Sequence, residues 1–287
     1  MWRSWRALAH LSRCELQVLV MKVSRGAFVS LRVITYGVMA LMYLPLLIIL
    51  VLSFNGSSSI SWPPKTYTTK WWTTIGDVAS AREALSTSAK LALIAVLIAI
   101  LLGTLLAFAL QRFDFFGKNT VSFLAVLPIA LPGIVTGVAM RNAFVRMGLD
   151  LGLLSVIAGH ATFCIVIAYN NVAARLRRMA PNLREASADL GASGWQTFRY
   201  ITWPLVRGAV VSGGILAFAL SFDEVVVTTF TAGAGVETLP QWILNNFSRP
   251  NVLPYVTVVA TLVMAVSLPL AWLAQRLSDG AESLAGR

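Results

Sequence analysis

Two acidic residues, Asp223 and Glu224, lie within an apolar stretch that extends over about residues 205–230. A carboxylate inside a hydrocarbon layer costs at least about 2.5 kcal/mol, so such residues usually face a cavity or a partner. On a continuous helix that begins near Pro204, they lie roughly 28–30 Å along the axis, at the outer side of a bilayer. Acids at that depth can offset the hydration that a cationic amine loses on entering a membrane.

The first interpretation is therefore a solute path that includes both acids and the two residues before them, Ser221 and Phe222. The alternative is structural. In it, one acid caps a helix or pairs locally, with Arg141 or Arg249, and the other sits in interfacial water. Both interpretations stay open from the sequence.

No residue pattern predicts catalysis, a metal site or a cofactor bound by this chain. His10 and His160 are the only histidines and belong to different elements, so no HExxH-type pair exists. Cys14 and Cys164 fit no CxxC spacing. A GxxxxGK[ST] loop is absent, so we expect that this chain does not bind ATP by itself. Asp223 has no aspartate partner in another apolar stretch, which argues against an intramembrane aspartyl protease.

The composition is that of a membrane protein. Of the 287 residues, 57% are hydrophobic and 12% are charged, which is too apolar for a soluble domain. The net charge of +11 does not indicate nucleic-acid binding here, because Lys and Arg cluster in alternate loops, as in cytoplasmic loops of membrane proteins. We therefore predict an all-α, polytopic bundle in which both termini are cytoplasmic.

Six segments are apolar and long enough to span a bilayer. They cover about residues 33–54, 85–110, 121–143, 151–172, 205–230 and 253–273. The predicted organisation is a basic cytoplasmic tail, a first span with an outer loop, a core of five spans and a short C-terminal tail, with the boundaries 1–32, 33–84, 85–276 and 277–287. Because the third span contains Pro128 and Pro132, we expect it to be kinked or locally unwound.

The N-terminal tail allows two interpretations. Arg3, Arg6, His10 and Arg13 share one helical face, which is typical of a helix lying on a membrane surface. Translation from Met21 is the equal alternative.

A few residues within the core are expected to serve packing. His160 fits a core histidine whose hydrogen bonds are satisfied. Gly133, Gly137 and the pair Gly213-Gly214 favour close approach of helices. Trp242, Asn245 and Asn246, before the last span, suit either a docking surface for a partner protein or an interfacial aromatic belt.

The longest polar, charged stretch of the core covers residues 182–204. Its first half is predicted to be helical up to Gly191. Its second half is predicted to form another short helix that stops before Pro204, because proline lacks an N–H and disfavours helix in the preceding residue. The loop counts place this stretch in the cytoplasm.

The pattern of this stretch is specific. Glu185-Ala186-Ser187-x-x-x-Gly191, then nine residues, then Ile201-x-Trp203-Pro204 resembles the EAA motif of permease subunits of binding-protein-dependent ABC importers. The chain departs from that motif at Ser187, where the family has alanine, and at Trp203, where it has leucine. The segments 127–137 and 221–225 resemble the spermidine/putrescine-type branch, and the likeness covers about residues 85–276.

The resemblance implies a type I importer fold in the inner membrane of a bacterium. It also implies three kinds of partner besides lipid: a second, homologous permease in a heterodimer, two copies of a cytoplasmic ATPase that binds ATP and Mg²⁺, and a periplasmic or lipid-anchored solute-binding protein. The residues it implies for coupling to the ATPase are Arg184, Glu185, Ala186, Asp189, Gly191, Trp195, Phe198, Ile201 and Pro204.

The function implied is passage of a polyamine or a related small amine. An ABC permease for an amino acid or another small organic cation is the main alternative. A transporter of a different class, driven by an ion gradient, is the second alternative, with Asp223 and Glu224 as its proton or cation sites.

Overall fold

The computed structural model describes residues 25–58, 62–180 and 182–283. The N-terminal tail, with the predicted surface helix and both candidate start residues, lies outside these ranges. The chain divides into two compact units, one ending at Val51 and one beginning at Leu52. In chain order, the helical elements are α3 (Arg25–Leu52), α4 (Lys70–Thr74), η1 (Ile75–Asp77), α5 (Ala79–Arg112), α6 (Lys118–Ala130), α7 (Gly133–Arg146), α8 (Leu153–Arg177), α9 (Asn182–Asp189), α10 (Gly194–Thr197), η2 (Phe198–Thr202), α11 (Trp203–Phe222), α12 (Val226–Thr231), α13 (Leu239–Asn246) and α14 (Leu253–Ser283).

The predicted all-α class is confirmed: the described residues contain no strand, and only an isolated bridge joins Asn55 to Tyr67. Four helical stretches there are long and apolar enough to cross a membrane, namely 28–52, 79–112, 153–177 and 194–222. The third predicted span corresponds to α6 and α7, whose axes differ by 102° at a short interruption of the helix. The predicted kink is therefore confirmed. The sixth predicted span corresponds to the apolar part of α14, residues 253–269.

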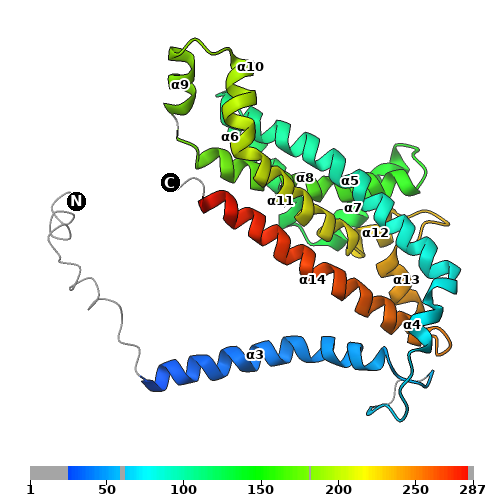
Figure 1. Ribbon diagram of the computed structural model, residues 1–287. Helices are drawn as coiled ribbons and strands as arrows, with labels where there is room; N and C mark the ends of the chain where they lie inside the picture. Colours follow the sequence, from blue (N-terminus) through cyan, green and yellow to red (C-terminus); the bar gives the residue numbers. More distant parts are fainter. Residues whose placement is uncertain (1–24, 59–61, 181, 284–287) are drawn as a thin grey trace. The chain divides into compact units, whose positions relative to one another are not determined.

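α5, α8 and α11 form the centre of the second unit, and α14 packs beside them on α11. α5 packs along α8, and α11 contacts α5, α8 and α14; Figure 1 shows these four helices running side by side. α12 packs against α7 and α8. The core is a series of small clusters between these helices, such as Leu110, Tyr169, Val172 and Val206 near one end of the bundle.

Small side chains set the distance between α5 and α8. The buried residues of α5 recur every three or four positions and are mostly alanine, with Ser88 and Gly103 in the same series. A Cβ added at Gly103 would lie 2.7 Å from Ile165 O and 2.9 Å from Tyr169 N, both in the backbone of α8. Helix backbones approach this closely in membranes only where side chains are small. The packing predicted for Gly137, Gly213 and Gly214 is likewise confirmed, since an added Cβ would meet Phe230 at 2.8 Å, Asn171 at 3.1 Å and Ile100 at 2.7 Å, respectively. At Gly133 the nearest atom, in Val226, would lie at 3.6 Å, which is an ordinary contact that does not require glycine.

This contact predicts a position-specific loss of stability. Gly103→Val should destabilise the bundle by about 3 kcal/mol, the upper end for an overpacked core, because backbone atoms cannot move aside. Leu101→Val adds the same β-branched residue on the exposed face of α5, where Leu101 is 61% exposed, and should leave the melting temperature in detergent almost unchanged. Equal melting temperatures for the two variants would contradict this account of the α5–α8 contact.

Three sequence expectations about the spans and their connections need correction. The fifth span is not one helix over 205–230, because α11 ends at Phe222 and a separate α12 follows. α14 continues to Ser283, into the segment expected to be a tail. Trp242 belongs to neither a surface nor an interfacial belt: it is 1% exposed and donates from Nε1 to Ser80 Oγ at 3.0 Å.

Candidate functional site: an exposed helical loop and a polar helix break

The polar stretch between α8 and α11 forms a compact helical loop, α9–α10–η2, at one end of the bundle (Figure 1). α9 ends in a Schellman motif, in which the Gly191 N–H donates to Ala188 O at 2.9 Å and the Ala192 N–H donates to Ser187 O at 3.1 Å. The motif needs a left-handed residue after the helix, and Gly191 has φ of +77°. The glycine expected to break the helix therefore sets the turn between α9 and α10.

The next helix begins with a capping box. The Ser193 Oγ accepts from the Gln196 N–H at 3.3 Å, and Gln196 Oε1 accepts from the Ser193 N–H at 2.7 Å. These bonds satisfy backbone groups that a helix start leaves without partners. α10 and α9 are then joined by a hydrogen bond of 2.8 Å between the buried hydroxyls of Ser187 and Thr197. Ser187, the departure from alanine, thus has a structural partner that the motif alone did not indicate.

Pro204 does not stop the second short helix, contrary to the sequence expectation. α10 continues through η2, a π-helical turn, into α11, and Pro204 lies in the first turn of α11. In η2, the Trp203 N–H donates to Phe198 O, five residues back. A wider turn before the proline relieves the clash of its ring with the preceding turn that a regular α-helix would produce. α10, η2 and α11 therefore form one continuous helical segment.

Aromatic and polar contacts attach the loop to the bundle. The ring of Phe198 makes an edge contact with Phe108 of α5, at a centroid distance of 5.8 Å. Arg175, in the last turn of α8, donates from Nε to Leu205 O at 2.9 Å. The loop is thus attached to α5, α8 and α11 together. Ile201, another predicted coupling residue, is partly buried in η2.

The outer surface of the loop is exposed. Trp195 is 70% exposed and stacks on Phe198, at 5.6 Å between centroids. The charged residues Arg184, Glu185 and Asp189 are exposed and make no ion pair with one another within 4 Å. Ala186 is exposed beside them. The loop therefore presents charges and an aromatic face while its inner side is fixed by hydrogen bonds.

The two acids, Asp223 and Glu224, lie in the break between α11 and α12, and the structure gives them different surroundings. Glu224 Oε1 accepts from the Val227 N–H at 2.9 Å and so caps α12. Asp223 is exposed, and its carboxylate has no hydrogen-bond or ion-pair partner among the described residues. Among the residues that the structure describes, neither acid forms an ion pair with Arg141 or Arg249. Local capping, one element of the structural alternative, is thus present for Glu224 alone.

His160 of α8 connects both sides of this break. Its Nδ1 lies 2.9 Å from Ser221 Oγ, and its Nε2 lies 2.8 Å from Thr228 Oγ1. The ring is fully buried, and Ser221 is 2% exposed. The expectation of a satisfied core histidine is confirmed. Thr228 was not singled out from the sequence, because a threonine in an apolar stretch carries no signal of its own.

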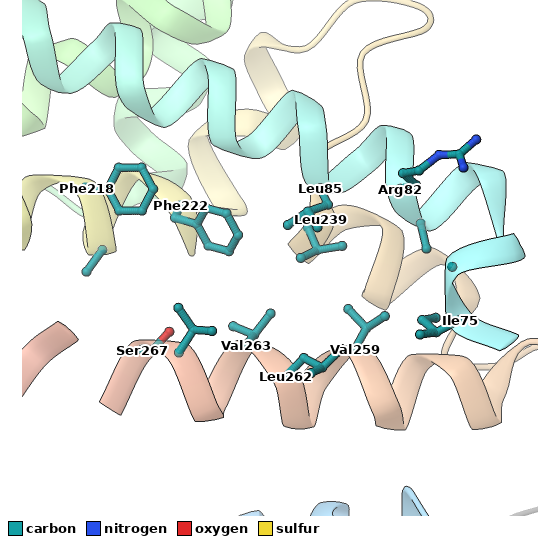
Figure 2. A pocket seen from close by; sticks show the side chains of 14 residues that line it. Ile75, Arg82, Leu85, Phe218, Phe222, Leu239, Val259, Leu262, Val263 and Ser267 are labelled. Carbon is teal, nitrogen blue, oxygen red and sulfur yellow. The ribbon is translucent and has the colours of Figure 1, made fainter. Parts of the chain in front are cut away.

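An apolar cavity of about 420 Å³ lies beside the break, between α5, α11, α13 and α14. Figure 2 shows Phe218 and Phe222 facing Val263 and Ser267 across it, and Arg82 at the far end with its guanidinium directed away. An ammonium group placed in this cavity would lose hydration without gaining a carboxylate. Phe222 therefore offers an apolar wall next to Asp223, and the cavity itself does not suit a charge.

Within the described residues, no group of three or more His, Cys, Asp or Glu side chains is placed to hold a metal ion. The arrangement consists of a helical bundle, an exposed loop continuous with one of its spans, and a polar break in that span. Together they define a transmembrane subunit of a transporter.

Comparison with known proteins gives the same class. A model of the family described as binding-protein-dependent transport system inner membrane component matches residues 99–282. The spermidine/putrescine transport system permease protein PotC of Escherichia coli K12 is 34% identical over 248 residues, which cover 86% of this chain and 90% of that protein. The putrescine transport system permease protein PotI of the same strain is 32% identical over 231 residues, covering 78% and 81%. This chain therefore belongs to the binding-protein-dependent transport system inner membrane component family.

Solved structures show the same fold at low sequence identity. A chain of a bacterial ABC transporter involved in the import of the acidic polysaccharide alginate matches with a TM-score of 0.67 at 13% identity, over 91% of this chain and 98% of that chain. A chain of an amino acid ABC transporter with histidines matches with a TM-score of 0.57 at 17% identity, over 73% and 97%. The predicted fold of an ABC importer transmembrane domain is confirmed.

Proposed function

We propose that this chain forms half of a membrane path for a polyamine or a related small amine, and that an ATPase bound to the α9–α10 loop drives it. The observation that carries the coupling role is the continuity of this loop with α11 through η2. The polyamine assignment is supported by the relatives named for spermidine and putrescine transport and by the unpartnered carboxylate of Asp223.

The assembly in this proposal contains a second, homologous permease, two copies of the ATPase, which hold ATP and Mg²⁺, and a periplasmic or lipid-anchored solute-binding protein. It lies in the bacterial inner membrane with the α9–α10 loop and both termini of this chain in the cytoplasm. When the ATPases close on ATP, they displace the exposed face of the loop. Because the loop is attached to α5, α8 and α11, the displacement becomes a rigid-body movement of spans and alternates access to the path.

Seven of the nine coupling residues have a role in this proposal. Glu185, Ala186 and Gly191 form the docking core, and the ion-pairing partners of the ATPase are Arg184, Glu185 and Asp189. Exposed ion pairs are worth only about 0–1 kcal/mol each. Most of the docking strength therefore comes from shape and from apolar contact with Trp195, whereas Phe198 holds the loop on α5.

In the path, Asp223 is the group that meets the solute. Its carboxylate is exposed at the C-terminal end of α11, where the helix dipole also favours a positive charge. The ring of Phe222 is available to the methylene segments between the ammonium groups of a polyamine. Glu224 keeps α12 capped, and Ser221 lies behind the path, bonded to His160.

Uptake by the host bacterium tests this proposal. Cells that lack this chain should lose most uptake of radiolabelled spermidine or putrescine and keep amino acid uptake, and a plasmid copy should restore the loss. Restored uptake should fail when ATP is depleted with arsenate and survive a protonophore, because the energy comes from nucleotide hydrolysis. Loss of amino acid uptake alone, or collapse with the protonophore alone, would refute the proposed solute or the proposed energy source.

A further inference from the structure

We propose that His160 is a positioning residue that holds the break between α11 and α12 and thereby aims the Asp223 carboxylate at the solute. The proposal rests on the solute path proposed above. It starts from one observation: a single buried imidazole makes hydrogen bonds to residues on both sides of the break, Ser221 and Thr228.

The hydrogen-bond network assigns a direction to each contact. The Thr228 hydroxyl donates to Glu224 O at 2.9 Å, so toward His160 its oxygen accepts. A neutral imidazole has one N–H donor and one acceptor nitrogen. Nε2 therefore carries the hydrogen and donates to Thr228, and Nδ1 accepts from the Ser221 hydroxyl. In this arrangement both ring nitrogens of His160 have a partner, one on each side of the break.

The two hydrogen bonds of His160 can form only because the helix is interrupted between Ser221 and Thr228. Residues seven positions apart on a continuous α-helix are separated by about 10 Å along the axis. The chain turns between Phe222 and Val226, and this turn lets Ser221 and Thr228 reach the same ring. His160 thus joins α8 to the last turn of α11 and to the first turns of α12.

Neighbouring residues of α8 hold α12 in the same place. A Cβ added at Gly159 would lie 3.0 Å from Val227 Cγ1, so α12 approaches α8 closely at the residue before His160. One turn earlier in α8, the Ser155 Oγ donates to Thr231 O at 2.7 Å. α12 is therefore fixed by α8 along its length, and His160 is the contact that also includes α11.

The consequence concerns Asp223, which lies two residues after Ser221 and whose carboxylate makes no hydrogen bond or ion pair among the described residues. Its backbone position is set by the end of α11 and by the start of α12. Since His160 bonds both, loss of either bond should let the carboxylate move relative to the path. His160 itself is buried and does not meet the solute.

Two conservative variants separate the two bonds. The amide of His160→Asn lies near the position of Nδ1 and keeps the contact with Ser221 only. The amide of His160→Gln lies near the position of Nε2 and keeps the contact with Thr228 only. Each should raise the half-saturating spermidine concentration for uptake about fivefold, the effect of one lost neutral hydrogen bond. Thr162→Val is the matched control, because the Thr162 hydroxyl bonds only Ala158 O of its own helix, and it should leave uptake unchanged.

A double-mutant cycle with Asp223→Asn decides whether His160 acts through Asp223. In the Asp223→Asn background, His160→Asn should cause less than about a twofold further rise in the half-saturating concentration, because the group that it positions is already gone. A second fivefold rise would overturn the inference and show general destabilisation. If His160→Asn does not reach the membrane, the same cycle with Ser221→Ala, which removes the Nδ1 bond from the other side, gives the answer by the same criterion.

The failures of the two proposals are distinguishable. If Asp223→Asn alone leaves the half-saturating concentration at the wild-type value, the solute path itself is wrong. If Asp223→Asn raises it and the His160 variants leave it unchanged, the path stands and the positioning role of His160 is wrong.

Discussion

Replacing Gly191 by proline is expected to abolish uptake while the chain still reaches the membrane. Proline holds φ near −65°, whereas Gly191 has φ of +77°. Proline also lacks the N–H that donates to Ala188 O. The Schellman turn that sets α9 against α10 is lost at a cost of about 3 kcal/mol or more. The damage stays in the exposed loop, since a Cβ at this position meets nothing within 4 Å.

The measurement pairs ATP hydrolysis with uptake in membrane vesicles that contain the full complex. In Gly191→Pro, hydrolysis should no longer respond to loaded binding protein, and uptake should fall to background at normal membrane levels of the chain. Gly191→Asn is the matched control, because asparagine is one of the few other residues that adopt the left-handed region. It should retain uptake within about twofold. Normal uptake in Gly191→Pro would refute the proposed coupling of the ATPase to the spans through the α9–α10 loop.

A charge reversal in the same loop tests docking separately from the turn. Glu185 is exposed in the first turn of α9, so Glu185→Lys leaves the backbone intact and changes only the surface that the ATPase meets. The variant should uncouple hydrolysis from uptake without lowering the melting temperature of the chain. Glu185→Gln removes the charge alone and should cost little, in line with the small value of an exposed ion pair.

Within the loop, the sequence predicted correctly the features that local chemistry decides, and it failed where a contact with a distant helix decides the conformation. The glycine break at Gly191 follows from a residue type, because only glycine takes a positive φ without strain. The prediction that the helix stops before Pro204 was wrong. The Trp203 N–H donates to Phe198 O, five residues earlier, and this bond replaces the regular α-helical pattern there. Phe198 packs on Phe108 of a distant helix, and no local rule for proline includes such a contact.

The break after Phe222 had no signal of its own in the sequence. Proline and glycine are the usual markers of an interrupted helix, and neither occurs between Ser221 and Thr231. The interruption depends on contacts from α8, through Gly159 and His160, that only the folded chain brings together. The acids could therefore be recognised as unusual, but their separate roles could not be assigned.

The burial of Trp242 has a similar cause. A tryptophan near the end of an apolar segment is typical of an interfacial belt. Here its indole N–H finds Ser80 Oγ, and its ring packs with Leu239 and Val256 in a core cluster. The partner serine lies in the first turn of α5, far away in the sequence. Aromatic residues of short connecting helices are thus ambiguous until the partner helix is known.

The different surroundings of Asp223 and Glu224 lead to the second large expected effect. Asp223→Asn should raise the half-saturating concentration of spermidine roughly ten- to hundredfold, because a hydrogen bond to a charged group is worth about 1.5–3 kcal/mol. The melting temperature should not fall, since the exposed carboxylate has no partner among the described residues. Uptake at graded spermidine concentrations measures the first quantity, and thermal denaturation in detergent measures the second.

Glu224→Gln should behave in the opposite way to Asp223→Asn. The glutamine oxygen can still accept from the Val227 N–H and cap α12, so the half-saturating concentration should stay within about twofold of wild type. Glu224→Ala removes the capping oxygen and should lower stability by about 1 kcal/mol. If Glu224→Gln were the variant that lost spermidine affinity while Asp223→Asn kept it, the assignment of the two acids would be reversed. The break would then present its capping residue to the solute, and α12 would have to move during transport.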